Sequence, residues 1–285
     1  MESLPFSVVM SVYRNDKAEF FLRALNSITN LQTIKPSEII LVVDGPIQSE
    51  VDEVIKNFDR ENPDLLKILR LKENGGLGNA LRLAIENASF ELIARMDSDD
   101  ISAPNRFEQQ IEFFKNNPTV DIVGGDISEF IGVEENIIAY RKVPMSDEKI
   151  KDYMKKRCPF NHVSVMYKKM AVQKAGGYLD LFWNEDYYLW IRMLECGAIM
   201  ANTGTVLVNV RTGKDMYKRR GGWRYFKSEK YLQKYMMKHK IIGIFTYIAN
   251  LTKRFLVQVL LPDKIRGYIF RRFARKTKNK VKKQN

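Results

Sequence analysis

Short apolar segments alternate with amphipathic ones along the first 117 residues, and this alternation restricts the fold more than any other feature of the chain. The apolar segments are rich in β-branched residues, which is typical of strands buried on both faces of a sheet. The strands predicted in this way are residues 6–12, 39–43, 66–71 and 92–96. The helices predicted after them are residues 18–28, 49–58 and 77–88, and one that begins near Pro104. Strands and helices in this order predict an α/β fold with a mostly parallel sheet, covered by helices on both faces.

Polar residues lie at or just beyond the end of each predicted strand. Tyr13 follows the first strand, Asp44 the second, Asn74 the third and Asp97 the fourth. The carboxyl ends of parallel strands meet at one edge of the sheet, where such sheets bind their ligands. We therefore expect these side chains to converge on one ligand site.

The most informative of these polar groups is Asp97-Ser98-Asp99. On an extended chain the side chains of residues i and i+2 point the same way, so Asp97 and Asp99 can share one hard divalent cation. Such a cation can in turn neutralise a diphosphate leaving group. The alternative is a solvated acidic loop that caps the next helix. The position of the motif at the end of a parallel strand favours the cation site.

Two further features of this edge have both a binding and a structural explanation. Asp44 can accept a hydrogen bond from a nucleobase or ribose, or it can close the turn that Asp-Gly-Pro favours. The glycine-rich segment 74–78 can bring backbone amides close to a nucleotide, or it can supply a turn with positive φ. It has neither the Gly-Lys-Ser/Thr of a phosphate-binding loop nor a convincing dinucleotide fingerprint.

The pattern is less regular after residue 117. We expect strands at 120–125, 162–167 and 205–210, and helices at 146–156 and 186–196. Glu185 and Asp186 precede the last helix and follow the aromatic pair Phe182-Trp183. They either cap that helix or supply a carboxylate general base beside an aromatic wall on which a sugar can stack. His162 is either a structural residue or a contact to phosphate or metal.

The charge of the chain is divided unevenly. Residues 211–285 hold 23 Lys and Arg against 3 Asp and Glu, whereas residues 1–210 hold 24 against 31. A basic tail on an acidic body indicates a polyanion or an anionic membrane surface as partner, not a nucleic-acid groove. Residues 241–260 have apolar side chains at helical spacing among Lys and Arg, which is typical of a helix that lies on an anionic membrane. The alternative is a helical pair that packs on the body or on a partner subunit, so a homo-oligomer stays open.

Three arginines lie in a glycine-containing segment at the start of this tail. Arg211, Arg219 and Arg220 either form a charged loop or clamp a diphosphate, because arginine forks match phosphate oxygens. No stretch has the roughly 18 apolar residues of a spanning helix, and the first residues do not have the pattern of a signal peptide. We therefore expect a cytoplasmic protein, bound peripherally to the inner face of the cell membrane.

Several segments in this order resemble the family 2 glycosyltransferases of the GT-A fold, and within them the bacterial polysaccharide-assembly enzymes of the amylovoran type. The resemblance runs from Phe6 to about Arg272. The segments that carry it are SVVMSVYRND, ILVVDGP, ENGGLGNAL, ARMDSDD, NEDYYLW and RTGKDMYKRRGG. It implies a GT-A catalytic domain at 1–215, with a nucleotide-sugar half at 1–117 and an acceptor-side half at 118–215. A basic, membrane-associating helical region follows at 216–285.

The resemblance also implies roles for individual residues, with a UDP-sugar donor and Mn²⁺ or Mg²⁺ as cofactor. Asp97 and Asp99 would be the DxD motif, in which the last Asp ligates the metal and the first contacts ribose or metal. Asp186 would be the base, supported by Glu185. The other donor-binding residues would be Ser11, Tyr13, Asp44, Asn74, Gly76, Gly78 and Ser98. The chain departs from the family pattern at Val43, where many members have an acid, and at Arg82, an arginine in a different register.

The function implied is an inverting hexosyltransferase of bacterial surface polysaccharide assembly, for O-antigen, capsule or exopolysaccharide. It would move galactose or another hexose from UDP to a membrane-borne saccharide acceptor, on a polyprenyl diphosphate or a lipid-A core. His162, Trp183, Arg211, Arg219 and Arg220 would contact the acceptor or a diphosphate. Two alternatives stay open. A nucleotidyltransferase would have a Gly- and Arg-rich loop where this chain has SVYRND, and a non-catalytic binder of anionic lipid or nucleic acid would not need the acids.

Overall fold

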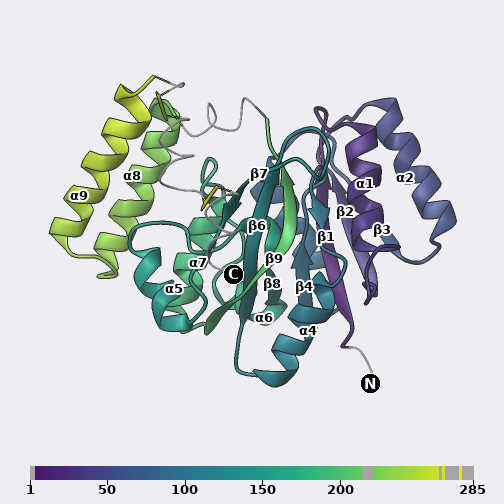
Figure 1. Cartoon of the computed structure of the whole chain (residues 1–285), viewed down its shortest axis with the longest axis horizontal. Helices are drawn as coiled ribbons and strands as arrows, with labels where there is room; N and C mark the ends of the chain where they lie inside the picture. The colour runs from purple at the N-terminus through teal and green to yellow at the C-terminus, as the bar shows by residue number, and fades with distance from the viewer. Residues whose placement is uncertain (1–3, 214–220, 263–264, 267–275, 278–285) are drawn as a thin grey trace.

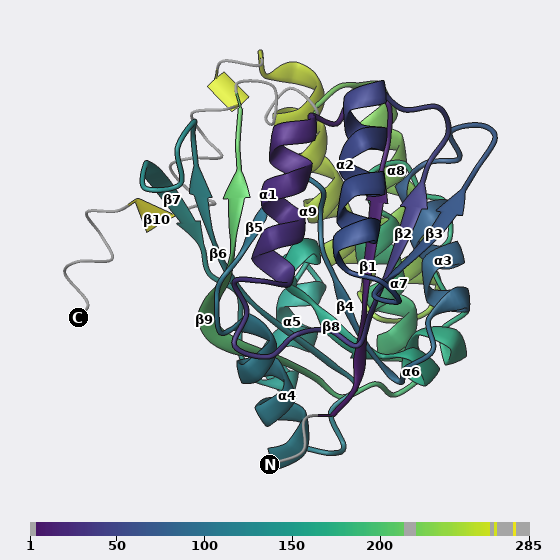
Figure 2. The same ribbon diagram turned by 90° about the vertical axis from the view of Figure 1, so that its right-hand side faces the viewer.

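The structure is a computed structural model of the 285-residue chain, and it describes residues 4–213, 221–262, 265–266 and 276–277 (Figure 1). The described strands form one curved sheet with helices on both sides. Figure 2 shows α1 and α2 side by side on one face of it.

The four strands predicted in the first part of the chain are confirmed. They are β1 (Phe6–Val12), β2 (Glu38–Val43), β3 (Leu66–Arg70) and β4 (Leu92–Arg95). They are parallel and lie in the order β3-β2-β1-β4, with Val12 opposite Val43. Their carboxyl ends therefore reach the same edge of the sheet, as the sequence predicts.

The helices between these strands cover the two faces of the sheet. They are α1 (Ala18–Ile28), α2 (Ser49–Glu61), α3 (Leu77–Asn87) and α4 (Arg106–Asn116). Val8 and Met10 of β1 pack with α1, α2 and α4, whereas Val9 packs with α3 on the other face. Successive side chains along a strand point to opposite faces of the sheet. Each buried side chain of β1 therefore packs into the hydrophobic core on one face or the other.

The second half of the sheet is mixed. Its strands are β5 (Ile101–Ser102), β6 (Ile122–Phe130), β7 (Ile137–Arg141), β8 (Met166–Lys168) and β9 (Met200–Arg211). β8 lies antiparallel between β4 and β6, and β9 runs parallel to β6. The helices of this half are α5 (Asp147–Met154), α6 (Lys169–Lys174) and α7 (Glu185–Glu195).

The strand predicted at residues 162–167 is wrong over its first half. His162–Ser164 forms a 3₁₀ turn, η1, and the strand begins only at Met166. The Ser164 hydroxyl and the Asn161 amide hydrogen-bond the backbone of Gly125 in β6. These side-chain hydrogen bonds replace the backbone hydrogen bonds that a strand would make with β6. Polar side chains such as Ser and Asn can offer the backbone this alternative to a sheet.

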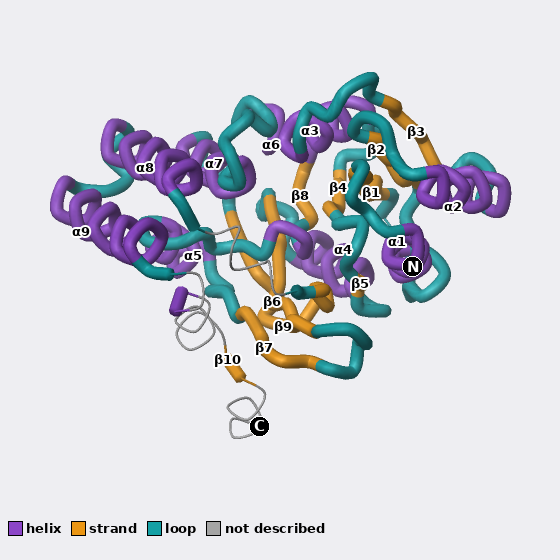
Figure 3. The backbone as a smooth tube through the Cα atoms, turned by 90° about the horizontal axis from the view of Figure 1, so that it is seen from above, coloured by secondary structure: helices purple, strands orange, loops and turns teal. Residues whose placement is uncertain are grey.

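The C-terminal helices pack side by side at one end of the molecule (Figures 1 and 3). They are α8 (Trp223–Lys238) and α9 (Ile244–Phe255), continued by a π-helical turn, η2 (Leu256–Leu260). Leu232 and Met236 of α8 share a core cluster with Trp190 of α7, so α8 packs as part of the main body. A short strand, β10 (Lys276–Thr277), pairs with β7.

The two C-terminal helices differ in what they bury. In α9 the buried residue is Asn250, whose amide donates to Gln233 of α8 and to the backbone of Lys155. Most of the apolar side chains of α9 therefore face outward. No helix within the described ranges combines the length and the apolar character needed to span a membrane.

Candidate functional site

Asp44, at the end of β2, holds the glycine-rich loop that follows β3. Its buried carboxylate accepts hydrogen bonds from the Asn74 amide at 2.9 Å, from the Gly75 nitrogen at 2.7 Å and from the Gly76 nitrogen at 3.0 Å. Gly45 next to it has a φ of +83°, and a Cβ there would lie 2.7 Å from the Asn74 nitrogen. The loop and the turn are thus fixed together, and the nucleoside contact expected of Asp44 stays a prediction.

A hollow of about 430 Å³ opens beside this turn. It lies between the ends of β2 and β3, and Val43, Gly45, Pro46 and Leu71 contribute to its wall. Ser11 and Tyr13, both half-buried, lie at the end of the neighbouring strand β1. The hollow is large enough for a small planar ring, since ligand pockets begin at about 300 Å³.

Asp97 is held by a buried arginine. Both terminal nitrogens of Arg95 donate to the two oxygens of Asp97, one of them over 2.6 Å. The Arg95 side chain is only 2% exposed, so its charge needs this partner. Arg106, which is buried as well, donates to the backbone oxygen of Arg95 at 2.7 Å and fixes the end of β4. The first acid of the motif is therefore positioned by the core of the protein.

Asp99 is exposed in the same loop, among other carboxylates. Partial desolvation, Asp97 and Asp16 together raise the pKa of Asp99 to about 6. Burial raises the pKa of Asp16 to about 6 as well, against the hydrogen bonds that its carboxylate accepts from the Tyr13 nitrogen and from Ser98. Sequence reasoning missed Asp16, although it stands in the polar segment that follows the first strand. Three carboxylates at one place create a potential that favours a divalent cation.

The donor atoms at this place fit such a cation in part. Among the described residues there is no cluster of three or more His, Cys, Asp or Glu side chains arranged to hold a metal. Since the carboxylate of Asp97 is paired with Arg95, the carboxylate of Asp99 is the one available to coordinate a cation. A Mg²⁺-type site commonly uses one or two carboxylates and takes its other ligands from substrate phosphates and water. The residues therefore fit a cation that binds together with a diphosphate.

The raised pKa of Asp16 predicts a pH-dependent cost to stability. Its carboxyl binds a proton more tightly in the folded than in the unfolded chain, so the free energy of unfolding falls as pH rises from about 4 to about 6. Asp16→Asn should remove this fall and increase the free energy of unfolding at pH 7.5 by about 2 kcal/mol. Urea unfolding at pH 4.5 and 7.5 measures it, with Glu53→Gln on α2 as an exposed control. An equal effect of Asp16→Asn at both pH values would contradict it.

Arg211, which the sequence predicts to contact a diphosphate, supports the acidic loop in this structure. Its guanidinium lies over the rings of Phe20 and Phe130, 3.8 Å and 4.7 Å from their centroids. Its Nε donates to the Asp99 carbonyl, and its backbone nitrogen donates to the buried carboxylate of Asp100 at 2.8 Å. Its contact with a diphosphate stays a prediction. Arg219 and Arg220 lie outside the described residues.

Glu185 and Asp186 form the first turn of α7, close to the glycine-rich loop. A Cβ on Gly78 would lie 3.4 Å from the Cβ of Glu185, so glycine allows α3 and α7 to approach at this point. Burial and the charge of Asp186 raise the pKa of Glu185 to about 7. Burial raises the pKa of Asp186 as well, opposed by the Tyr187 nitrogen and by Arg141. The pair is thus held next to the glycine-rich loop by the packing of α7 against the start of α3.

His162 belongs to a buried aromatic cluster behind the acidic loop. Its Nε2 is 2.7 Å from the hydroxyl of Tyr178, and its ring lies edge-on to Trp190. Burial and the nearby Arg95 hold the pKa of His162 well below its usual range. The imidazole is therefore neutral at physiological pH and supplies no positive charge to a phosphate. Its contact with an acceptor stays a prediction.

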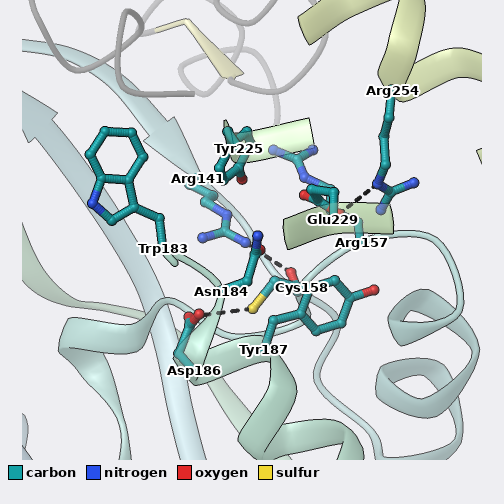
Figure 4. A pocket seen from close by; sticks show the side chains of 10 residues that line it. All are labelled: Arg141, Arg157, Cys158, Trp183, Asn184, Asp186, Tyr187, Tyr225, Glu229 and Arg254. Carbon is teal, nitrogen blue, oxygen red and sulfur yellow. Dashed lines mark hydrogen bonds and ion pairs between the residues drawn. The ribbon is translucent and has the colours of Figure 1, made fainter. Parts of the chain in front are cut away.

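Trp183 is exposed beside Asp186 on a strained backbone. Its φ is +55°, which is unusual for a bulky residue, and its indole, stacked on Phe182, is 47% exposed. Trp183 and Asp186 line one pocket of about 170 Å³ (Figure 4). The other residues that line it are Arg141, Arg157, Cys158, Asn184, Tyr187, Tyr225, Glu229 and Arg254. Sequence reasoning did not single out its arginines.

The chain was compared with known proteins. Residues 7–181 match the family described as Glycosyl transferase family 2. The amylovoran biosynthesis glycosyltransferase AmsE of Erwinia amylovora is 35% identical, over 93% of this chain and 97% of AmsE. An Escherichia coli protein named UDP-Gal:alpha-D-GlcNAc-diphosphoundecaprenol beta-1,3-galactosyltransferase is 36% identical, over 95% of this chain and 97% of that protein.

Two solved structures of similar fold contain bound nucleotide sugars. S. aureus TarS 1–349 in complex with UDP-GlcNAc aligns with a TM-score of 0.65 at 15% identity, over 89% of this chain and 73% of that one. The mannosyltransferase PcManGT of Pyrobaculum calidifontis, with GDP-Man and Mn²⁺, aligns with a TM-score of 0.61 at 15% identity, over 90% and 71%. At this identity the likeness establishes the GT-A fold alone.

Proposed function

The chain belongs to glycosyl transferase family 2, and from that premise we propose that it moves galactose or another hexose from UDP to a membrane-borne saccharide in bacterial polysaccharide assembly. One observation carries the proposal. The Asp97–Asp99 loop follows a parallel strand at the same sheet edge as the glycine-rich loop. The first turn of α7 approaches both, since Glu185 lies against Gly78 and the charge of Arg95, which pairs with Asp97, acts on Glu185 and Asp186. The names of two relatives, an amylovoran enzyme and a galactosyltransferase that uses UDP-Gal, support the substrate class.

The donor would bind along the carboxyl edge of the parallel strands. The hollow between β2 and β3 would take the uracil, with Ser11, Tyr13 and Asp44 near the nucleoside. The loop that contains Asn74, Gly76 and Gly78 would lie along the nucleotide, and Asp97 and Ser98 would lie near the ribose and phosphates. Asp99 would hold Mn²⁺ or Mg²⁺, which would offset the negative charge of the departing UDP.

Asp186 would act as the base on the acceptor. Its side chain is half-buried, and the charge of Arg141 helps to keep it ionised against the desolvation that raises its pKa. It would accept the proton of the acceptor hydroxyl as that oxygen attacks the anomeric carbon, so transfer would invert the configuration. Glu185, with its pKa of about 7, would hold the first turn of α7 against the glycine-rich loop.

The acceptor side would lie against a membrane. We define the α9 patch as Ile244, Phe245, Ile248, Leu256 and Leu260, all exposed apolar residues, with Phe245 86% exposed. Lys253 is exposed on the same helix, and the chain from residue 211 on carries most of the excess positive charge. An apolar face with a basic surround suits the interface of an anionic bilayer. On this proposal the enzyme would act in the cytoplasm, bound peripherally to the inner face of the membrane.

Phe245→Glu should weaken binding to anionic vesicles at least about tenfold, because burial of a Phe side chain is worth about 1.5–3 kcal/mol and the new charge is repelled. Co-sedimentation with phosphatidylglycerol vesicles at low and high salt measures it. Gln173→Glu on α6 makes the same change of charge outside the α9 patch and should have little effect. Equal losses in both variants, or no loss in either, would contradict the membrane face.

The proposed function is tested by transfer from a panel of UDP-sugars to an N-acetylglucosamine α-diphosphate that carries an alkyl chain. We expect transfer of one hexose, in the presence of Mn²⁺, with a product of inverted anomeric configuration by NMR. Transfer from another nucleotide sugar alone would contradict the UDP donor. Retention of configuration would contradict the role of Asp186.

A further inference from the structure

The pocket beside Asp186 is built from arginines of three separate elements. Arg141 ends β7, Arg157 follows α5, and Arg254 belongs to α9 (Figure 4). Residues that are distant in the sequence thus bring three guanidinium groups to one cavity, next to the proposed base. Charges of one sign that converge on a cavity indicate an anionic ligand.

The charges in the pocket do not cancel. Arg254 pairs with Glu229 at 2.6 Å and donates to the backbone of Lys156. The side chains that line the pocket include these three arginines and two acids, Asp186 and Glu229. The lining thus carries one more positive than negative charge, which suits an anionic ligand.

Arg141 has at least one hydrogen-bond donor available for a ligand. Its Nη2 donates to the backbone oxygen of Cys158 at 2.8 Å, which fixes the direction of the guanidinium. Its Nε is buried and has no partner among the described residues. Arginine has five N–H donors in a rigid fork that matches phosphate oxygens, and a buried donor without a partner is costly.

The size and position of the pocket select the ligand. Its volume of about 170 Å³ is below that of pockets for whole small molecules, which begin at about 300 Å³, so it can enclose the charged part of a larger ligand but not the whole ligand. Tyr225, Glu229 and Arg254 of the C-terminal helices line it, and the α9 patch lies on α9 and its continuation η2. A ligand that arrives from a membrane at α9 would thus enter a pocket that the C-terminal helices share with Asp186 and Trp183.

We propose that Arg141 and Arg157 bind the diphosphate of a lipid-linked saccharide acceptor in this pocket, separately from the diphosphate of the donor. The acceptor's first sugar then lies between Trp183 and Asp186, with its hydroxyl at the base. This inference rests on the proposed function and assigns the acceptor's anionic group to residues other than Arg211, Arg219 and Arg220.

The test compares two acceptors on the full-length protein. One is N-acetylglucosamine α-diphosphate with a short alkyl chain, and the other is the neutral alkyl α-glycoside of the same sugar. Arg141→Gln should raise the KM of the diphosphate acceptor about tenfold to a hundredfold, because bonds to a charged group are lost. The KM of the neutral acceptor and the KM of the donor should hardly change. Arg157→Gln should also raise the KM of the diphosphate acceptor. Arg141→Lys, which keeps the positive charge, should raise it less than Arg141→Gln. Arg60→Gln, at an exposed position on α2, is the control and should leave every KM unchanged.

Calorimetry with the diphosphate acceptor analogue, with and without saturating UDP, separates the two sources of diphosphate. Binding that persists with UDP and weakens in Arg141→Gln supports the proposal, even if no sugar is transferred and the proposed function fails. Binding abolished by UDP would assign the pocket to the donor and overturn it. Equal KM values for both acceptors in the wild type, or equal losses for both in Arg141→Gln, would overturn it as well.

Discussion

Asp186→Asn should lower kcat for sugar transfer by about 10²–10⁴-fold, the usual contribution of a general base. The amide has nearly the shape of the carboxylate, and its oxygen can still accept the hydrogen bond from the Cys158 thiol, 3.7 Å away in the wild type. It cannot accept a proton from the acceptor hydroxyl at neutral pH. The loss should therefore fall on kcat, with UDP binding and the free energy of unfolding nearly unchanged. Steady-state kinetics together with calorimetry of UDP binding measure both quantities.

Two comparisons make this result specific to Asp186. Glu112→Gln removes an exposed carboxylate on α4 and should leave kcat unchanged. Glu185→Gln should reduce kcat less than Asp186→Asn, because Glu185 acts through its position against the glycine-rich loop. If Asp186→Asn instead abolished UDP binding, Asp186 would belong to the donor site and another group would have to be the base.

Asp99→Ala should abolish metal-dependent UDP binding, with a loss of more than about 100-fold. Removal of a group that only orients a metal ligand commonly costs about 10–100-fold in affinity, so loss of the ligand itself should exceed that range. Asp97 cannot take over as metal ligand without breaking its ion pair with Arg95. The Arg95 side chain is only 2% exposed, and Asp97 compensates its buried charge. Calorimetry of UDP with and without Mn²⁺ measures the effect, and transfer should fall in parallel.

The neighbouring acid provides the matched control. Asp97→Ala leaves the charge of Arg95 buried without its partner and should destabilise the fold by about 3–5 kcal/mol. Asp99→Ala removes a carboxylate that its neighbours repel, so the free energy of unfolding should stay equal or rise slightly. Thermal unfolding separates the two variants. Metal-dependent UDP binding that survived in Asp99→Ala would exclude Asp99 as the ligand and reopen the assignment of the acidic loop.

Much of the first half of the fold follows from local pattern. β1, β2 and β4 lie where apolar segments predict them, because a strand buried on both faces must be apolar along its length. β3 also lies where it is predicted, but it is the last strand in the sheet order and is only partly buried. The topology of a parallel sheet then brings Tyr13, Asp44, Asn74 and Asp97 to one edge, whatever the details of packing. The family also follows from the order of the motifs along the chain.

The elements that the sequence did not predict depend on distant partners. β5 is two residues long and exists because β9 pairs with it, and β9 runs to 12 residues where only six were expected. The 3₁₀ turn at His162 replaces a predicted strand because Ser164 and Asn161 bond to Gly125, far away in sequence. Periodicity reports which face of a segment is apolar, but it holds no information on such partners.

The sequence by itself determined the α/β class, the acidic edge and the pair of carboxylates at the start of α7, because residue types and spacing set burial and strand ends. Only the tertiary structure decided which charged side chains pair with each other and which gather at the site. It pairs Asp97 with Arg95, gathers Asp16 beside Asp99, and directs Arg211 to the backbone of the acidic loop. It also assembles Arg141, Arg157 and Arg254 beside Asp186. Electrostatic interactions depend on distance in space and on burial, and neither is set by separation along the chain.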